Sequence, residues 1–147
     1  MLFRSGNCGC AAYAASNATD INDDEILNVT LGTLNNTSTC GALAGGAGSI
    51  AYEYSNYAGV VSGPSLTQGF TYPGSVTIGF CNGIAYTTSF AVYVDYNQNG
   101  SFADAGELIT AQQGLTAAVG GTAFTFNITI PGTALTGLTR KIGRAHV

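Results

Sequence analysis

The sequence predicts an all-β fold, an antiparallel two-sheet β-sandwich of jelly-roll or Ig-like type. Apolar residues alternate with polar ones at a period of two, and no segment shows a helical period of 3.6. Pairs of turn-forming residues recur between the alternating segments. The 147 residues include 21 Gly but only 4 basic and 8 acidic side chains, so the residues that cover long surface helices are scarce.

Six segments are expected to form strands. Leu27, Val29 and Leu31 alternate with polar residues before Gly32 and the polar run 35–38 stop the pattern. The alternation is clearest near the end of the chain, where Pro131-Gly132 terminate it. In chain order the expected strands are 27–31, 51–57, 75–80, 90–96, 108–111 and 124–130. Turns are expected at 45–46, 62–64, 73–74, 82–83, 99–100 and 120–121.

Composition excludes several classes of function. With only 4 basic residues the chain has too little positive charge to bind a phosphate backbone, so we expect no nucleic-acid partner. No run of 18 apolar residues is present, so we expect no membrane insertion. The acidic run 20–25 is expected to be a solvated strand edge rather than a binding site.

Both ends of the sequence resemble translated sequencing adapters. The N-terminal Met1 to Ser5 begins like a signal peptide, but no apolar stretch follows it. Leu-Phe-Arg-Ser is the translation of CTC-TTC-CGA-TCT, and residues 142–147 are the translation of ATC-GGA-AGA-GCA-CAC-GTC. We therefore expect residues 1–5 and 141–147 to be adapter-derived and the domain to span 6–140; chance is the alternative.

Setting the ends aside changes the expected chemistry. The segment 6–140 contains no His, and Arg140 is its single basic residue. Without His the segment lacks the usual general base, the commonest zinc ligand and both Ser-His and Cys-His pairs. We therefore expect no catalytic activity and no catalytic residues in this chain.

The segment 95–107 has the oxygen pattern of a calcium loop. Oxygen-bearing side chains stand at loop positions 1, 3 and 5, a glycine that permits a sharp turn stands at position 6, and carboxylates stand at 10 and 13. Ca²⁺ takes six to eight oxygen ligands, and Phe102 within the loop is expected to point into the core. The expected metal ligands are Asp95, Asn97, Asn99, Ser101, Asp104 and Glu107.

The loop differs from an EF-hand, because Gly106 stands where that motif has its bidentate Glu and strands are expected on both sides. The alternative interpretation is a long hairpin in which Asn99-Gly100 serves a turn and nearby Asp and Asn side chains cap the backbone. Calcium is favoured because the pattern carries more acids than a turn needs. Its expected role is structural, through binding to the folded state.

Cys8, Cys10, Cys40 and Cys81 favour a disulfide framework and an oxidising, extracellular location. A bond between Cys8 and Cys10 would close a strained ring. That leaves a bond between Cys40 and Cys81, or one from each of these to an N-terminal cysteine. Free cytosolic thiols are the alternative.

A series of motifs along the chain resembles the GEVED domain over nearly all of 6–140. The most specific is 95–102, Asp-Tyr-Asn-Gln-Asn-Gly-Ser-Phe, and the others lie at 26–38, 54–57, 66–72, 106–107, 128–131 and 139–140. The resemblance implies a β-sandwich module of secreted bacterial proteins with an accessory, non-catalytic role. The strand that names the family is expected after Arg140, so the resemblance also implies that the last strand or strands are missing.

Two classes of function follow. The first is an accessory module of a secreted or cell-surface bacterial protein, serving adhesion, ligand binding or domain spacing, with a surface polysaccharide, a protein or neighbouring domains as partners. The second is a fragment of a secreted peptidase or glycoside hydrolase whose catalytic domain lies outside this chain. Tyrosines could stack on sugars, although tyrosines on strands more often serve packing. The tyrosines considered for this role are Tyr52, Tyr54, Tyr57, Tyr93 and Tyr96.

Overall fold

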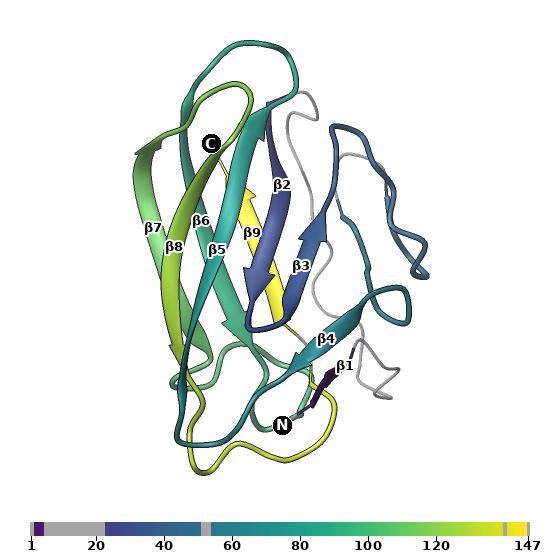
Figure 1. The fold of residues 1–147 in the computed structure, drawn as a ribbon, viewed down its shortest axis with the longest axis vertical. Coiled ribbons are helices and arrows are strands. Elements are labelled where there is room, and N and C mark those ends of the chain that lie inside the picture. Colours follow the sequence, from purple (N-terminus) through teal and green to yellow (C-terminus); the bar gives the residue numbers. More distant parts are fainter. Residues whose placement is uncertain (1, 5–22, 51–53, 140, 147) are drawn as a thin grey trace.

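A computed structural model describes residues 2–4, 23–50, 54–139 and 141–146, with side chains over 23–50, 54–139 and at 141. Within these ranges the chain forms β-strands and no helix (Figure 1). Accordingly, no helix of the described part is long and apolar enough to cross a membrane. The strands are β1 (Leu2–Arg4), β2 (Asp24–Leu31), β3 (Leu34–Thr37), β4 (Ser62–Ser65), β5 (Thr71–Phe80), β6 (Thr87–Val94), β7 (Leu108–Thr116), β8 (Thr122–Thr129) and β9 (Lys141–His146).

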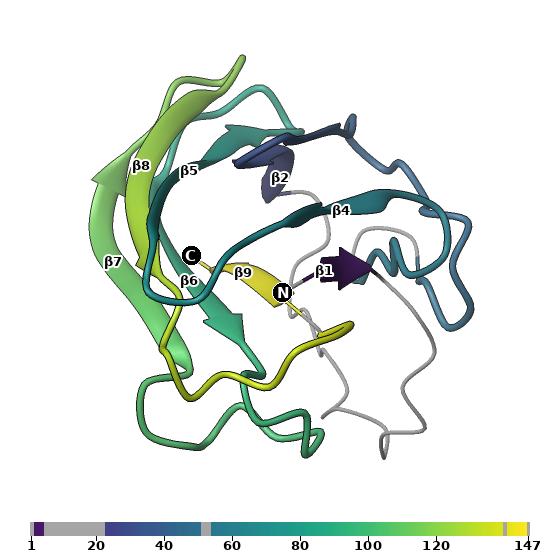
Figure 2. The ribbon, with the colours of Figure 1, turned by 60° about the horizontal axis from the view of Figure 1, so that its bottom comes forward.

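The strands form two facing sheets and a short side ribbon (Figures 1 and 2). One sheet has the order β3-β2-β5-β8 and the other the order β7-β6-β9, while β1 pairs with β4. Every pair is antiparallel. The predicted all-β, antiparallel two-sheet sandwich is therefore confirmed.

The core lies between the two sheets, where alternate residues of the long strands point inward. Burying a large apolar side chain contributes about 1.5–3 kcal/mol, so this double layer carries most of the stabilisation. The predicted alternation in 90–96 and 124–130 is confirmed. The inward residues are Val76 and Ile78 of β5, Phe90, Val92 and Val94 of β6, and Phe126 and Ile128 of β8.

A β-bulge in β2 changes which residues face this core. The register moves from Ile26 opposite Ile78 to Asn28 opposite Thr77, so Leu27 is the extra residue. Ile26 packs against the core in its place. The predicted inward set of Leu27, Val29 and Leu31 is therefore wrong at its first position, because a bulge shifts the phase of the alternation by one residue.

Several predicted boundaries need correction. The polar run 35–38 does not simply end a strand, because Leu34–Thr37 pairs with β2 as strand β3. The expected turns at 62–64 and 73–74 lie inside β4 and β5. In the expected strand 51–57, residues 51–53 are outside the described part and Tyr54 makes only an isolated bridge with Ile50. Hydrogen bonding to distant partners overrode these local turn signals.

Strand β9 lies in the segment 141–147 that the sequence analysis assigns to an adapter. It pairs with β6 from Lys141 opposite Val94 to His146 opposite Ser89, so β6 has a neighbour on both sides. The amine of Lys141 lies 5.4 Å from the centre of the Phe126 ring. Burial lowers the pKa of Lys141 to about 8.

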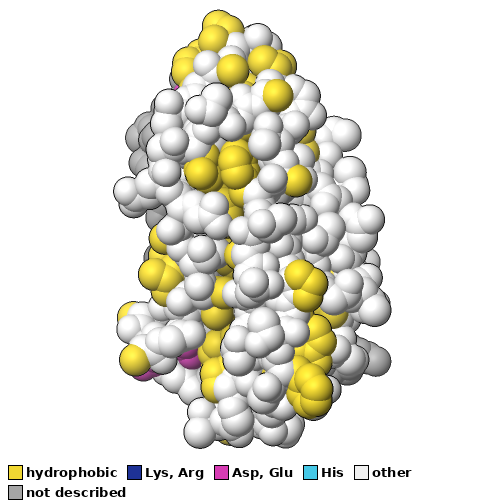
Figure 3. Space-filling view, turned by 60° about the vertical axis from the view of Figure 1, so that its left-hand side comes forward, with side chains coloured by type: hydrophobic (Ala, Val, Ile, Leu, Met, Phe, Trp, Pro, Cys, Tyr) yellow, Lys and Arg dark blue, Asp and Glu magenta, His cyan; other side chains and the backbone are white. Residues whose placement is uncertain are grey.

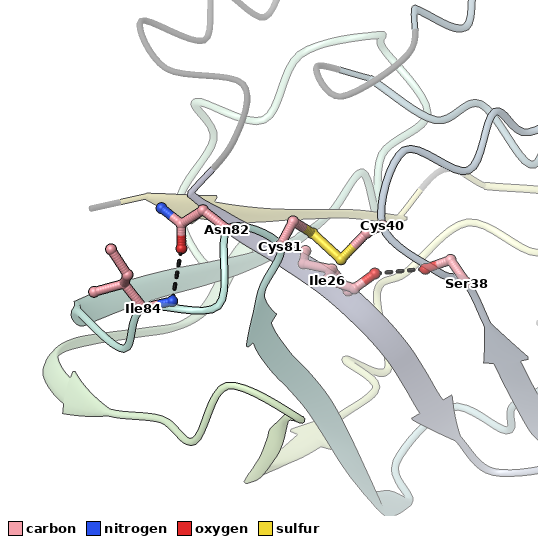
Figure 4. Close-up of a disulfide and its surroundings, with 6 residues drawn as sticks. All are labelled: Ile26, Ser38, Cys40, Cys81, Asn82 and Ile84. Atoms are coloured by element: carbon pink, nitrogen blue, oxygen red, sulfur yellow. Dashed lines mark hydrogen bonds between the residues drawn. A yellow bond between two sulfur atoms is a disulfide. The ribbon is translucent and has the colours of Figure 1, made fainter.

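A disulfide joins Cys40, after β3, to Cys81, after β5 (Figure 4). This is one of the pairings that the sequence left open. Cys8 and Cys10 lie outside the described residues. Near the bridge, the Ser38 hydroxyl donates to the Ile26 carbonyl at 2.5 Å, which fixes the chain leaving β3 against the start of β2.

Candidate functional site

The predicted calcium loop connects β6 to β7 at the lower end of the sandwich in Figure 1. The backbone N–H of Val94 donates to the carbonyl of Glu107 at 2.9 Å and closes the loop at its neck. Because the alternating pattern of β6 puts Val94 in the core, the residues that follow begin at the edge of the buried layer.

Two carboxylates lie at this neck, and both are buried. Asp95 is 1% exposed, and its two oxygens accept the backbone N–H groups of Asn99 at 3.2 Å and Gly100 at 3.0 Å. Glu107 is 2% exposed, and its Oε1 accepts the N–H of Tyr96 at 3.0 Å. Its Oε2 is buried and has no hydrogen-bond partner. A buried carboxylate oxygen without a partner is costly, which makes it a candidate ligand for a cation.

The charges and hydrogen bonds around Glu107 also favour a cation at this position. Burial raises the pKa of Glu107, and hydrogen bonds from the backbone of Asn97 and Tyr96 lower it. The charges of Asp95 and Asp104 raise it further, so three carboxylates repel one another across the loop. A bound cation would offset this repulsion.

The outer part of the loop is a chain of side-chain to backbone hydrogen bonds. The Oδ1 of Asn97 accepts the N–H of Asn99 at 3.0 Å, and the Oδ1 of Asn99 accepts the N–H of Ser101 at 2.7 Å. The Nδ2 of Asn99 donates to Asp104 at 2.8 Å, and this bond is the main cause of the lowered pKa of Asp104. Ser101 Oγ accepts the N–H of Ala103 at 3.1 Å.

All six predicted residues lie in this one loop, and the capping bonds expected of a plain hairpin are present there. An amide or carboxylate oxygen has more than one lone pair, so accepting one N–H does not prevent it from binding a metal. No group of three or more His, Cys, Asp or Glu side chains in the described part of the chain has metal-binding geometry. A site here would consequently need the amide and hydroxyl oxygens as well as the acids.

The backbone of the loop is held in an unusual conformation. Gln98 has a φ of +56°, which is uncommon for a residue other than glycine, and Gly100 has a φ of +85°. The Gln98 side chain donates to the carbonyls of Leu135 at 3.3 Å and Thr136 at 3.4 Å. The neighbouring loop thus holds Gln98 in a conformation that it would rarely adopt alone.

Two residues outside the loop support it without any signal in the sequence. The N–H of Leu135 donates to the carbonyl of Tyr96 at 2.9 Å, and the hydroxyl of the buried Thr139 donates to the carbonyl of Asp95. No local pattern marks either residue, because each contact spans about forty positions of the chain. The loop 131–139 is therefore the structural support of the candidate site.

Two expectations about aromatic residues need correction. Phe102 is only half-buried and contacts Tyr93, with 5.9 Å between ring centres, rather than joining the core. Tyr96 is 6% exposed and part of the core, so its ring offers no surface for stacking on a sugar. Burial raises the pKa of Tyr96 to about 12. Tyr52 lies outside the described residues.

The loop, the strands on both sides of it and the supporting segment together span β6 to β9. Residues 89–145 match the GEVED domain. The predicted family is confirmed over this stretch, which is less than half of the chain and extends into residues 141–147.

GEVED domains form a family of non-catalytic accessory modules. The matched stretch contains the whole candidate loop and Thr139. No curated protein and no solved structure matches the chain.

Proposed function

We propose that this chain is a non-catalytic accessory module of a secreted or cell-surface bacterial protein, in which Ca²⁺ stabilises the loop 95–107. The observation that carries the calcium assignment is the buried, unpartnered Oε2 of Glu107 beside the charges of Asp95 and Asp104. Calcium would supply the missing positive charge, and the oxygens of Asn97, Asn99 and Ser101 would complete its shell.

The surface supports a secreted module. Figure 3 shows the side formed by β7 and β8, where few acidic side chains and no basic side chain are visible among the described residues. The disulfide between Cys40 and Cys81 is typical of oxidising compartments. Both features support a location outside the cytoplasm.

Calcium binding is tested by thermal unfolding in excess Ca²⁺ and in excess chelator. At a hundredfold excess over Kd, a site in the folded state adds about 2.7 kcal/mol. For a chain of this size that is a rise in Tm of roughly 5–10 °C. Asp95→Asn should lose most of the rise. Glu25→Gln is the matched control, because it likewise replaces a carboxylate withdrawn from solvent by its amide, and strand β2, to which Glu25 belongs, begins at the opposite end of the sandwich (Figure 1).

The proposed role in adhesion, ligand binding or domain spacing needs a separate test. A hollow of about 320 Å³ lies between β6 and β7 beside Tyr93 and Gln113, where a polysaccharide could contact the domain. Binding of the folded protein to an array of glycans would support ligand recognition. Normal folding with no binding to any glycan would favour spacing of neighbouring domains, and hydrolysis of a peptide or glycan would contradict the non-catalytic assignment.

A further inference from the structure

The turn between β5 and β6 carries an exposed Asn82-Gly83 pair next to the disulfide. Asn82 Oδ1 accepts the N–H of Ile84 at 2.9 Å (Figure 4). Asn82 Nδ2 donates to Asp23 Oδ1 and to the hydroxyl of Tyr86, both at 3.1 Å. Gly83 has a φ of +79°, and among the described residues, its two chain neighbours apart, no heavy atom lies within 4 Å of the place where a Cβ would stand.

This arrangement favours a reaction of the chain with itself. The backbone nitrogen of Gly83 can attack Cγ of Asn82, forming an N–Cγ bond while the Cγ–Nδ2 bond breaks. The proton of the Gly83 N–H leaves with Nδ2 as ammonia, and the product is a five-membered succinimide. Water then opens the ring to aspartate or isoaspartate. The Ile84 N–H already donates to the oxygen on which negative charge develops, and Gly83 has no Cβ to obstruct ring closure.

The chain contains a matched second pair, Asn99-Gly100, in the β6–β7 loop. Asn99 Oδ1 also accepts an N–H two residues later, from Ser101 at 2.7 Å, and Asn99 Nδ2 also donates to a carboxylate, Asp104, at 2.8 Å. Gly100 also has a positive φ, +85°. The two asparagine side chains are therefore held in nearly the same way.

The pairs differ at the attacking nitrogen. The Gly100 N–H donates to the carboxylate of Asp95 at 3.0 Å. Within the described part of the chain, the structure gives the Gly83 N–H no acceptor. The Gly100 nitrogen can attack only after its hydrogen bond to the charged Asp95 carboxylate has broken. Breaking such a bond raises the activation free energy enough to slow the reaction by about tenfold or more.

We propose that Asn82 is a self-modification site that converts to aspartate or isoaspartate in the folded protein, and that the bond from Gly100 to Asp95 protects Asn99. Conversion would place a new carboxylate against Asp23, one residue from Cys81. The attractive contact between Asn82 and Asp23 would become a repulsion between like charges. The modification would therefore weaken the contact between the segment before β2 and the turn after β5.

The test is incubation of the intact, disulfide-bonded protein in buffer near neutral pH, with peptide mapping by mass spectrometry over time. In the folded protein, Asn82 should convert about tenfold or more faster than Asn99. In a denaturing concentration of urea the two rates should become similar, because both pairs then share the same local chemistry. The proposal is overturned if Asn99 keeps pace with Asn82 in the folded protein, or if the ratio is the same in both states.

A variant tests the protective bond directly. Asp95→Ala removes the side-chain acceptor of the Gly100 N–H and should raise the conversion of Asn99 toward that of Asn82, whose own rate should not change. Circular dichroism establishes whether the variant is folded. If the variant is folded and the conversion rate of Asn99 is unchanged, the protective role is contradicted. If the variant is unfolded, the protective role is judged from the ratio of the Asn82 and Asn99 rates in native and in urea-unfolded wild-type protein.

Discussion

Glu107 Oε1 accepts the backbone N–H of Tyr96 at 3.0 Å across the neck of the β6–β7 loop, while Oε2 of the same carboxylate is buried without a partner. Oε1 thus closes the loop through its hydrogen bond, whereas Oε2 has no hydrogen-bond partner and its carboxylate is subject to the negative charges of Asp95 and Asp104. Glu107 therefore holds the loop closed with one oxygen, and its other oxygen is the atom on which the proposed calcium site depends most.

Glu107→Gln should separate these two roles. The amide can still accept the Tyr96 N–H, and it removes the charge that Asp95 and Asp104 repel. In chelator we expect the variant to unfold at the same temperature as the wild type or a higher one. In Ca²⁺ it should lack the rise in Tm expected for the wild type, as measured by thermal unfolding. An equal calcium-dependent rise in the two proteins would remove Glu107 from the ligand set.

Lys141 predicts a pH dependence of stability. Burial lowers its pKa to about 8, against 10.5 for the ordinary side chain. Between these values the unfolded chain binds more protons than the folded chain, so the contribution of Lys141 to stability rises with pH and its penalty is fully present below about pH 8. Lys141→Met should raise the free energy of unfolding by roughly 1–3 kcal/mol near neutral pH. Urea unfolding at about pH 7 and about pH 9.5 measures this, and the gap between variant and wild type should narrow at the higher pH. A constant gap would contradict the burial of the amine.

The bridge between Cys40 and Cys81 spans a sequence separation of 41 residues. Closing a loop of that length lowers the entropy of the unfolded chain enough to stabilise the fold by about 4 kcal/mol. The double variant Cys40→Ser, Cys81→Ser should lose that amount in urea unfolding. A Cys8→Ser, Cys10→Ser variant serves as the control for loss of other cysteines. A loss below about 1 kcal/mol in the first variant would show that the bridge adds little.

Two glycines provide a matched test of close packing. A Cβ on Gly74 in β5 would lie 2.5 Å from the Phe126 ring and 3.0 Å from the carbonyl oxygen of Thr30. Gly74→Ala should therefore destabilise the fold by about 1–3 kcal/mol. A Cβ on Gly132 would meet nothing within 4 Å, so Gly132→Ala should be neutral or stabilising by up to about 1 kcal/mol. Equal effects of the two variants on the urea midpoint would contradict the packing of β5 on β8.

Much of the fold follows from local sequence. The alternation in 90–96 and 124–130 predicts strands with one buried face, and the structure buries Phe90, Val92 and Ile128 as expected. A period of two is a property of consecutive residues, so it can be recognised without knowing the partner strand. The same holds for the candidate loop, whose six proposed calcium ligands fall within thirteen positions of the chain.

Other features depend on residues that are far apart. The polar strand β3 forms because its backbone pairs with β2 while the side chains of Asn35 and Thr37 are exposed. The Asn28 side chain donates to the Asn35 side chain at 2.7 Å and to the Thr37 hydroxyl at 2.9 Å. The bulge at Leu27 exchanges one inward residue for another, which no periodicity could indicate.

The sequence by itself determined the class of fold, the resemblance of residues 89–145 to the GEVED domain and the place where the acidic loop lies, because each depends on short patterns. Only the tertiary structure decided that Cys40 pairs with Cys81, that Leu135 and Thr139 support the loop, and that Glu107 Oε2 is buried without a partner. These relationships come from the packing of two sheets, which brings together residues whose separation in sequence carries no local signal.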